Sequence, residues 1–128
     1  MTPEKPALRV LVVEDELLIR WSIQETLNRA GCLVMEAADG ATAVRLLQAT
    51  ADPVDVVLLD FRLPDSNDLQ LLSKIRVLTP SSPVILMTAF GTPEVFEGAR
   101  RLGVSRILDK PFDIHELPGI VHDARVPS

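Results

Sequence analysis

Short apolar runs alternate along the chain with longer segments in which apolar residues recur every three or four positions. The runs are rich in Val, Ile and Leu, which is typical of strands buried on both faces of a parallel sheet. They predict strands over residues 8–13, 32–36, 54–60, 83–88 and 104–109. Because these strands alternate with helical segments, the predicted fold class is α/β, a doubly wound five-stranded parallel sheet. Of the two common strand orders we favour 2-1-3-4-5, because the number of strands matches it.

Helical spacing and local end signals place the helices. The predicted helices cover residues 17–30, 39–50, 67–78 and 93–102, with a less regular one from about residue 114. Thr92-Pro93 is typical of a helix start, with Thr as the N-cap and Pro at the first helical position. Pro118-Gly119 lies inside the last helical segment. Interior Pro costs roughly 3 kcal/mol and interior Gly roughly 1 kcal/mol, so we predict a single turn and a helix that restarts at Pro118.

Length and charge exclude several classes of protein. The chain has 128 residues and a formal net charge of −5 without a Lys/Arg run, so direct nucleic-acid binding by this chain is not expected. No apolar run is long enough to cross a membrane, and the N-terminus lacks the apolar core of a secretory signal. Cys32 is the only cysteine, which fits a cytoplasmic setting. We predict one domain over residues 8–124, a flexible arm over 1–7 and a tail over 125–128. The domain either stands alone or belongs to a longer protein with an output domain.

Polar side chains stand where the predicted strands end. Glu14 and Asp15 follow the first strand, Asp60 ends the third, Thr88 ends the fourth and Lys110 follows the fifth. In the favoured order these strands are neighbours, and ligands of open α/β sheets bind outside the carboxyl ends of the strands. Three carboxylates at one edge repel one another unless a cation joins them. Their oxygens are hard ligands, and no His or Cys accompanies them, so the pattern favours Mg²⁺.

The same residues suit phosphoryl transfer. Lys110, Thr88 and the metal would form a receptor for a phosphoryl group, with Asp60 between them as the nucleophile that becomes an aspartyl phosphate. Each residue alone has an ordinary structural explanation, because an Asp after a strand is more often a turn or helix cap. The joint pattern is more specific, since five independent placements must coincide.

Two other functions are open at this point. A haloacid-dehalogenase-type Mg²⁺-dependent phosphatase also uses a strand-end Asp nucleophile, but it needs a second Asp two residues later, where this chain has Arg62. A nucleotide- or flavin-binding module needs a Gly-rich turn after the first strand, where Glu14-Asp15-Glu16 would repel phosphate. Turnover of a generic phosphate ester would separate the phosphatase from a domain that only receives phosphate.

Four motifs at the strand ends resemble those of one family over residues 8–124. They are Val13-Glu14-Asp15-Glu16, Leu59-Asp60-Phe61-Arg62-Leu63-Pro64, Met87-Thr88-Ala89 and Asp109-Lys110-Pro111-Phe112. Together they resemble the receiver domain of bacterial two-component response regulators, whose sheet is flavodoxin-like (CheY-like). Ile19-Arg20-Trp21 and Met87-Thr88-Ala89-Phe90-Gly91 look most like receivers of nitrogen-regulatory-type activators.

The resemblance implies a role for each site residue. Asp60 would accept phosphate from a sensor histidine kinase or a phosphotransfer protein, in a signalling domain that is not a dedicated enzyme. Asp15, Asp60 and the backbone carbonyl of Arg62 would hold Mg²⁺, with Glu14 reaching the ion through water. Thr88 and Lys110 would bind the phosphoryl oxygens. The resemblance also allows a homodimer through the face of the fourth helix, fifth strand and fifth helix.

The chain departs from the family at two places. Receivers commonly carry Asp-Gly where Asn67-Asp68 stands, and an Asp there would be strained if the backbone needed a positive φ. Ile107 occupies the place of an aromatic that turns inward after the strand-four hydroxyl moves. Because Ile is stiff at χ1, we predict that phosphorylation moves Thr88 and the following loop with Phe90, and leaves the Ile107 rotamer nearly unchanged.

A docking surface is predicted on the first helix. Leu18 and Trp21 lie three residues apart, off the inner face of the helix. Either Trp21 packs against the last helix, or the pair meets the helices of the kinase, which the resemblance implies for this helix. Trp and Leu can anchor such an interface.

Overall fold

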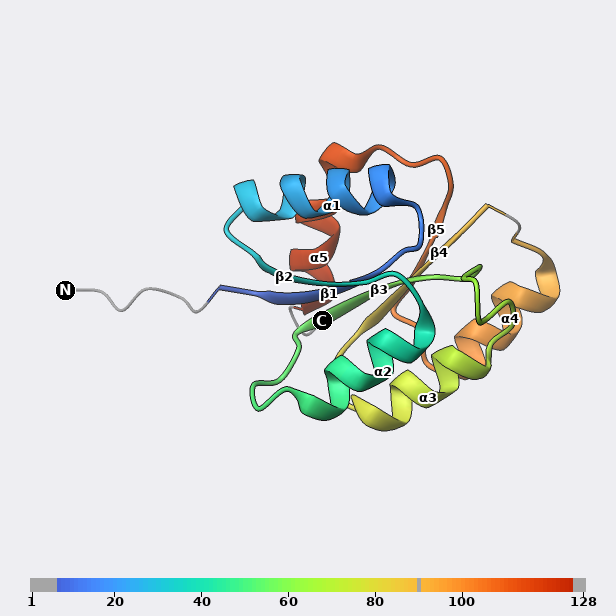
Figure 1. Ribbon diagram of the computed structural model, residues 1–128. Helices are drawn as coiled ribbons and strands as arrows, with labels where there is room; N and C mark the ends of the chain where they lie inside the picture. Colours follow the sequence, from blue (N-terminus) through green and yellow to red (C-terminus); the bar gives the residue numbers. More distant parts are fainter. Residues whose placement is uncertain (1–6, 90, 126–128) are drawn as a thin grey trace.

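The computed structural model describes residues 7–89 and 91–125. A five-stranded parallel sheet has the order β2-β1-β3-β4-β5, which confirms the predicted fold class and strand order (Figure 1). Its strands are β1 (Arg9–Val13), β2 (Leu33–Ala37), β3 (Val56–Asp60), β4 (Val84–Thr88) and β5 (Arg106–Asp109). Residues 1–6 of the predicted arm and 126–128 of the predicted tail lie outside the described residues.

Helices cover both faces of this sheet, as Figure 1 shows. One face is covered by α1 and α5, and the other by α2, α3 and α4. The helical segments are α1 (Leu17–Arg29), α2 (Gly40–Ala49), α3 (Gln70–Leu78), α4 (Pro93–Arg101), the 3₁₀ turn η1 (Ile114–Glu116) and α5 (Leu117–Arg125). In the described part of the chain, no helix is long and apolar enough to span a bilayer.

The central strands explain why the apolar runs are unbroken. Every residue of β3 and of β4 is buried, because helices lie above and below them. Successive side chains point to opposite faces, so Leu59 and Leu86 join the core under α2 and α3, while Leu58 and Ile85 join the core under α1 and α5. The sheet therefore holds the carboxyl ends of β3 and β4 in a fixed frame.

The third helix begins later than the sequence predicts. It starts at Gln70, and residues 67–69 remain loop. Leu63 and Ser66 pair through two backbone hydrogen bonds of 2.7 and 3.2 Å, and an Asp68 carboxylate oxygen accepts from the Gln70 amide at 2.9 Å. No described residue other than glycine has a positive φ. The strain considered for Asn67-Asp68 is therefore absent.

The last helix has the predicted interruption. The 3₁₀ turn η1 ends at Glu116, and α5 starts at Leu117, one residue before the predicted restart. Pro118 therefore lies in the first turn of α5, where its missing amide proton breaks no intrahelical hydrogen bond.

Candidate functional site

Three carboxylates meet at the carboxyl edge of the sheet. One oxygen from each of Glu14, Asp15 and Asp60 lies within 4.8 Å of the other two. Glu14 and Asp60 are 1% and 6% exposed, whereas Asp15 faces solvent. The cluster opens into a pocket of about 270 Å³, lined by Glu14, Asp15, Glu16, Asp60, Arg62, Ala89 and Lys110. The structure thus brings the two carboxylates that follow β1 together with the one that ends β3.

Lys110 joins the two buried carboxylates. Its ammonium nitrogen lies 2.7 Å from Glu14 Oε1 and 3.0 Å from Asp60 Oδ2. The backbone holds the residue in place, because the Lys110 amide donates to the Thr88 carbonyl at 2.8 Å just past the end of β5. The buried Thr88 pairs in register with Asp109, while Asp60 pairs with Met87. Thr88 therefore stands one residue beyond Asp60 on the neighbouring strand.

Charge is not balanced in this cluster by Lys110 alone. Burial raises the pKa of the Glu14 carboxyl, and the nearby Asp60 raises it further, so that Lys110 only partly offsets the increase. Burial lowers the pKa of the Lys110 ammonium, but hydrogen bonds with Glu14 and Asp60 outweigh burial and leave that pKa raised. Three carboxylates thus face one ammonium, and a second cation would relieve their mutual repulsion.

The donor set fits a divalent hard cation. The three described candidates are all carboxylates, and one of them is open to solvent. Oxygen ligands of this kind suit Mg²⁺, which keeps several waters and is bound by one or two carboxylates in many phosphate sites. The Arg62 amide donates to Asp60 Oδ1 at 3.3 Å, so this hydrogen bond holds the Arg62 backbone beside the Asp60 carboxylate.

Arg20 holds the loop after β1, a role that the sequence pattern does not predict. Its guanidinium donates to the Glu14 carbonyl at 2.8 Å and pairs with Glu36 at 3.2 Å. The Glu14 amide donates to the Ala37 carbonyl at 3.0 Å. Arg20 therefore holds the loop that carries Glu14 and Asp15 against β2. No helical spacing rule signals this contact, because the acceptor is a loop carbonyl.

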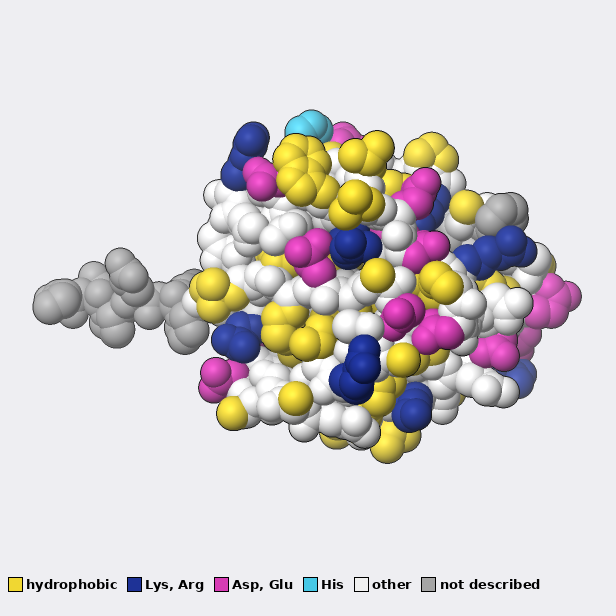
Figure 2. Space-filling model, viewed as in Figure 1, with side chains coloured by type: hydrophobic (Ala, Val, Ile, Leu, Met, Phe, Trp, Pro, Cys, Tyr) yellow, Lys and Arg dark blue, Asp and Glu magenta, His cyan; other side chains and the backbone are white. Residues whose placement is uncertain are grey.

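The predicted docking pair lies beside the site. Leu18 is 78% exposed and Trp21 is 55% exposed, so most of the indole is not packed against α5. Hydrophobic side chains gather over α1 in Figure 2, at the upper edge of the view. Leu18 also borders an apolar groove of about 450 Å³, lined by Leu18, Ile19, Ser22, Ala89, Lys110, Pro111, Phe112 and Ile114.

The predicted switch residues are only partly described. Ile107 is half-buried and packs against the core beneath α4. Phe90 lies outside the described residues. Gly91 lies against the tip of the Phe96 ring, because a Cβ built on Gly91 would lie 2.3 Å from Phe96 Cζ. Phe96 and Ile107 also line one pocket between α4 and β5.

Comparison with known proteins identifies the family to which the sequence is similar. Residues 10–122 match the family model described as the response regulator receiver domain. The chain is 32% identical over 109 residues to sporulation initiation phosphotransferase F of Bacillus subtilis, covering 85% of this chain and 86% of the relative. It is 37% identical over 115 residues to the DNA-binding transcriptional regulator NtrC of Escherichia coli, covering 90% of this chain but only 24% of that protein.

Solved structures agree on the fold. A CheY-like receiver domain protein from Methanospirillum hungatei superposes with a TM-score of 0.86 at 24% identity, covering 92% of this chain and 93% of the other. The chemotaxis response regulator CheY4 of Vibrio cholerae superposes with a TM-score of 0.83 at 26% identity, covering 93% of this chain and 99% of the other. These superpositions show that the chain shares its fold with both proteins.

Proposed function

This chain belongs to the response regulator receiver domain family of two-component systems, and from that premise we propose that Asp60 is its phosphoacceptor. The observation that carries the proposal is the position of Asp60, which ends the buried central strand β3 with its carboxylate bound to Lys110 inside the acidic cluster. A sensor histidine kinase or a phosphotransfer protein would donate the phosphoryl group. Labelling with acetyl phosphate and Mg²⁺, followed by peptide mass spectrometry, tests which residue is modified.

The side chains divide the work of phosphoryl transfer among them. A carboxylate oxygen of Asp60 forms the new P–O bond while the P–N bond to the donor histidine breaks and its electron pair remains on the imidazole. The Lys110 ammonium and the Thr88 hydroxyl bind phosphoryl oxygens at the end of transfer. Asp15, Asp60 and the Arg62 carbonyl would hold Mg²⁺, with Glu14 acting through water. When bound, the ion neutralises charge on the phosphoryl oxygens.

We infer a signalling role without catalytic turnover. The position two residues after Asp60 is Arg62, so the acidic group that a haloacid-dehalogenase-type phosphatase needs there is replaced by a cation. Absence of steady turnover with a generic phosphate ester would support this.

We further propose a cytoplasmic location, no direct contact with nucleic acid by this chain, and homodimer formation through the face of α4, β5 and α5. The match covers only 24% of NtrC, and DNA binding is a property of that whole protein.

We propose that Leu18 and Trp21 form the docking surface for the phosphodonor. Trp21→Ala should slow phosphotransfer from the cognate kinase by about tenfold, because loss of a half-exposed Trp anchor weakens the complex by roughly 1–2 kcal/mol. Labelling by the small donor acetyl phosphate should stay unchanged, since that reaction needs no docking surface. Initial rates with each donor give the measurement.

Val77→Ala is the matched control for this test. Val77 is an exposed apolar residue like Trp21, with 78% of its surface exposed, but it lies on α3, on the other side of the sheet (Figure 1). Its substitution should leave both rates unchanged. A folded Trp21→Ala protein that takes phosphate from the kinase at the normal rate would remove the docking proposal.

The switch, in our proposal, runs through the β4–α4 loop. Thr88 donates to a phosphoryl oxygen, and the loop that begins at Ala89 follows its displacement. Gly91 lies against the tip of the Phe96 ring, so movement of the loop is passed to α4 by direct contact. Ile107 has no ring to turn into the vacated space, and its χ1 is restricted.

Methyl NMR with beryllofluoride and Mg²⁺ tests this route. We expect large shifts for the methyl groups of Ala89 and Thr92 and for the Phe96 ring, with the Ile107 rotamer conserved. The Val77 methyl groups on α3 should stay in place and act as the internal reference. A large rotamer change at Ile107 with Thr92 and Phe96 unmoved would contradict the proposed route.

A further inference from the structure

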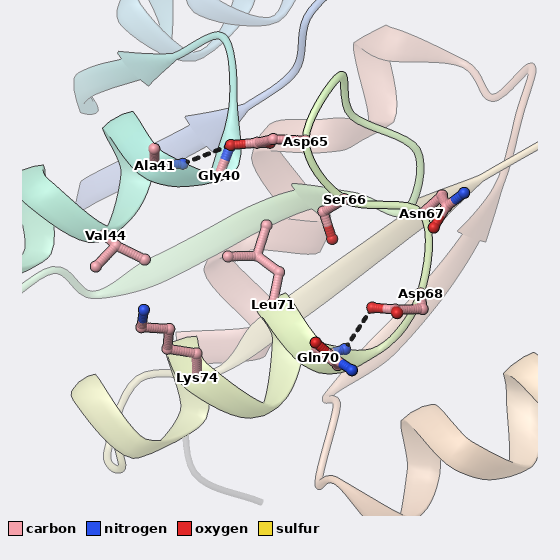
Figure 3. A pocket seen from close by; sticks show the side chains of 10 residues that line it. All are labelled: Gly40, Ala41, Val44, Asp65, Ser66, Asn67, Asp68, Gln70, Leu71 and Lys74. Carbon is pink, nitrogen blue, oxygen red and sulfur yellow. Dashed lines mark hydrogen bonds between the residues drawn. The ribbon is translucent and has the colours of Figure 1, made fainter.

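The loop that follows the acidic site is fastened to a helix by one side chain. Asp65 Oδ1 accepts a hydrogen bond from the Gly40 amide at 2.8 Å, and its Oδ2 accepts one from the Ala41 amide at 3.0 Å. Figure 3 shows Asp65 reaching across from the β3–α3 loop to the first turn of α2. A carboxylate that accepts from two amides at a helix N-terminus is favoured both by hydrogen bonding and by the helix dipole.

Helix α2 already has its own cap, so the contact from Asp65 needs another explanation. Asp39 is the N-cap, and its side chain accepts from the Thr42 amide at 2.7 Å while its carbonyl accepts from Ala43 at 3.2 Å. Asp65 takes the two remaining amides of the first turn from a distant part of the chain. Two aspartates therefore cap one helix, but only one of them belongs to the loop after Asp60.

Gly40 allows this close approach. A Cβ at that position would lie 3.2 Å from Asp65 Oδ1 and 2.9 Å from Leu71 Cδ2, which is tighter than ordinary van der Waals contact. On the α3 side, the loop borders an open pocket of about 550 Å³, with Asn67 and Asp68 on its rim. Packing against α3 thus leaves part of the loop uncovered. The two hydrogen bonds between Asp65 and the first turn of α2, which we call the tether, limit the movement of the loop.

The tether is connected to the acidic site through a short, rigid turn. Asp65 lies inside the turn that Leu63 and Ser66 close with two backbone hydrogen bonds. Leu63 is 7% exposed and anchored in the core, and the Arg62 amide donates to Asp60 Oδ1. The Arg62 backbone is therefore held between Asp60 on one side and the tethered turn on the other.

We propose that Asp65 is a positioning residue for the metal site, which sets the place of the Arg62 carbonyl by tethering the loop to α2. The inference rests on the proposed function, because it assigns the Arg62 carbonyl as a ligand of Mg²⁺. Substitutions of residues that orient metal ligands commonly weaken metal affinity by 10–100-fold. Asp65→Ala should raise the Kd for Mg²⁺ by about tenfold, near the lower end, because Asp65 acts through the backbone and not on a ligand directly.

Isothermal titration calorimetry with Mg²⁺ tests the tether, with Asp39→Ala as the matched control. Both substitutions remove cap hydrogen bonds from α2, so both should lower the melting temperature by a similar amount. Only Asp65→Ala should weaken Mg²⁺ binding. Labelling by acetyl phosphate should be slowed in Asp65→Ala at low Mg²⁺ and should return to the wild-type rate at saturating Mg²⁺.

Asp65→Asn separates a tether from a charge effect. The amide keeps one acceptor oxygen but loses the negative charge, so a tether predicts a Kd between those of the wild type and Asp65→Ala. Equal Kd values for the Asn and Ala variants would assign the effect to charge and overturn the proposal. It would also be overturned if Asp65→Ala bound Mg²⁺ like the wild type, or if Asp39→Ala were weakened equally. A wild-type chain that neither binds Mg²⁺ nor accepts phosphate would instead remove the proposed function itself.

Discussion

Asp60→Asn is expected to abolish labelling by acetyl phosphate in the presence of Mg²⁺. The substitution keeps the size and shape of the side chain, including an oxygen that can still accept from Lys110, so the buried end of β3 should stay folded. It replaces the carboxylate oxygen that would form the P–O bond with an amide of very low nucleophilicity. We expect a loss on the order of a thousandfold or more in the labelling rate, measured by intact-protein mass spectrometry.

The acidic cluster makes this experiment discriminating. Asp15 is exposed and lies within the same group of oxygens, so it is the other carboxylate that a small phosphodonor could reach. If Asp15 were the acceptor, Asp60→Asn would still be labelled, and the assignment of Asp60 would be wrong. Asp123→Asn, an exposed carboxylate on α5, serves as the control and should be labelled like the wild type.

The strand arrangement could be predicted because β3 and β4 are continuous apolar runs, each ending in one polar residue. Every residue of β3 and β4 is buried, so the apolar pattern there has one interpretation. The edge strands are less regular, and β2 leaves Leu33 and Glu36 exposed. Once the order of the strands was chosen, their carboxyl ends placed Glu14, Asp60 and Lys110 together. The residues that could be predicted are therefore those whose position follows from the sheet alone.

Contacts that depend on loops could not be predicted in this way. The sequence pattern predicts no role for Asp65, because its hydrogen bonds to Gly40 and Ala41 span 25 and 24 residues. Arg20 binds a loop carbonyl, which no periodic pattern marks. The sequence predicts too early a start for α3, because helical spacing continues backward from Gln70 into residues 67–69. In the structure Leu63 and Ser66 close a turn just before this segment, and the Asp68 carboxylate accepts from the Gln70 amide. In each case a local signal exists, but its partner lies in a distant part of the chain.

The loops after β3 and β4 flank Asp60 and contact different helices. The loop after β3 is fastened by Asp65 to α2, whereas the loop after β4 contacts α4 through Gly91 and Phe96. A phosphoryl group on Asp60 would lie between them. We therefore expect the first loop to keep its place while the second moves, because the Asp65 carboxylate gives the first loop two charge-assisted hydrogen bonds to α2.

Lys110→Met should lower the free energy of unfolding by about 3 kcal/mol at pH 8 in the presence of EDTA. Methionine preserves the length of the apolar stem but removes the ammonium that is bonded to the carboxylates of both Glu14 and Asp60, and an uncompensated buried charge is costly. Removing one partner of a buried ion pair usually costs about 3–5 kcal/mol. We expect the low end of this range because the Lys110 side chain is 18% exposed and the cluster can take up a proton. Urea denaturation gives the measurement, with exposed Lys74→Met on α3 as the matched control.

The pH dependence of this deficit identifies its cause. The pKa of Glu14 is already raised in the folded protein, and removal of Lys110 takes away a neighbour that lowers it, so the folded pKa should rise further. A carboxyl whose folded pKa exceeds its unfolded pKa loses stability as the pH rises between the two values. The difference between Lys110→Met and the wild type should therefore shrink as the pH falls from 8 toward the unfolded pKa of Glu, about 4.3. Millimolar Mg²⁺ should stabilise the variant more than the wild type at pH 8, because the ion then supplies the missing positive charge. A deficit that is independent of both pH and Mg²⁺ would mean that Lys110 contributes packing and not charge compensation.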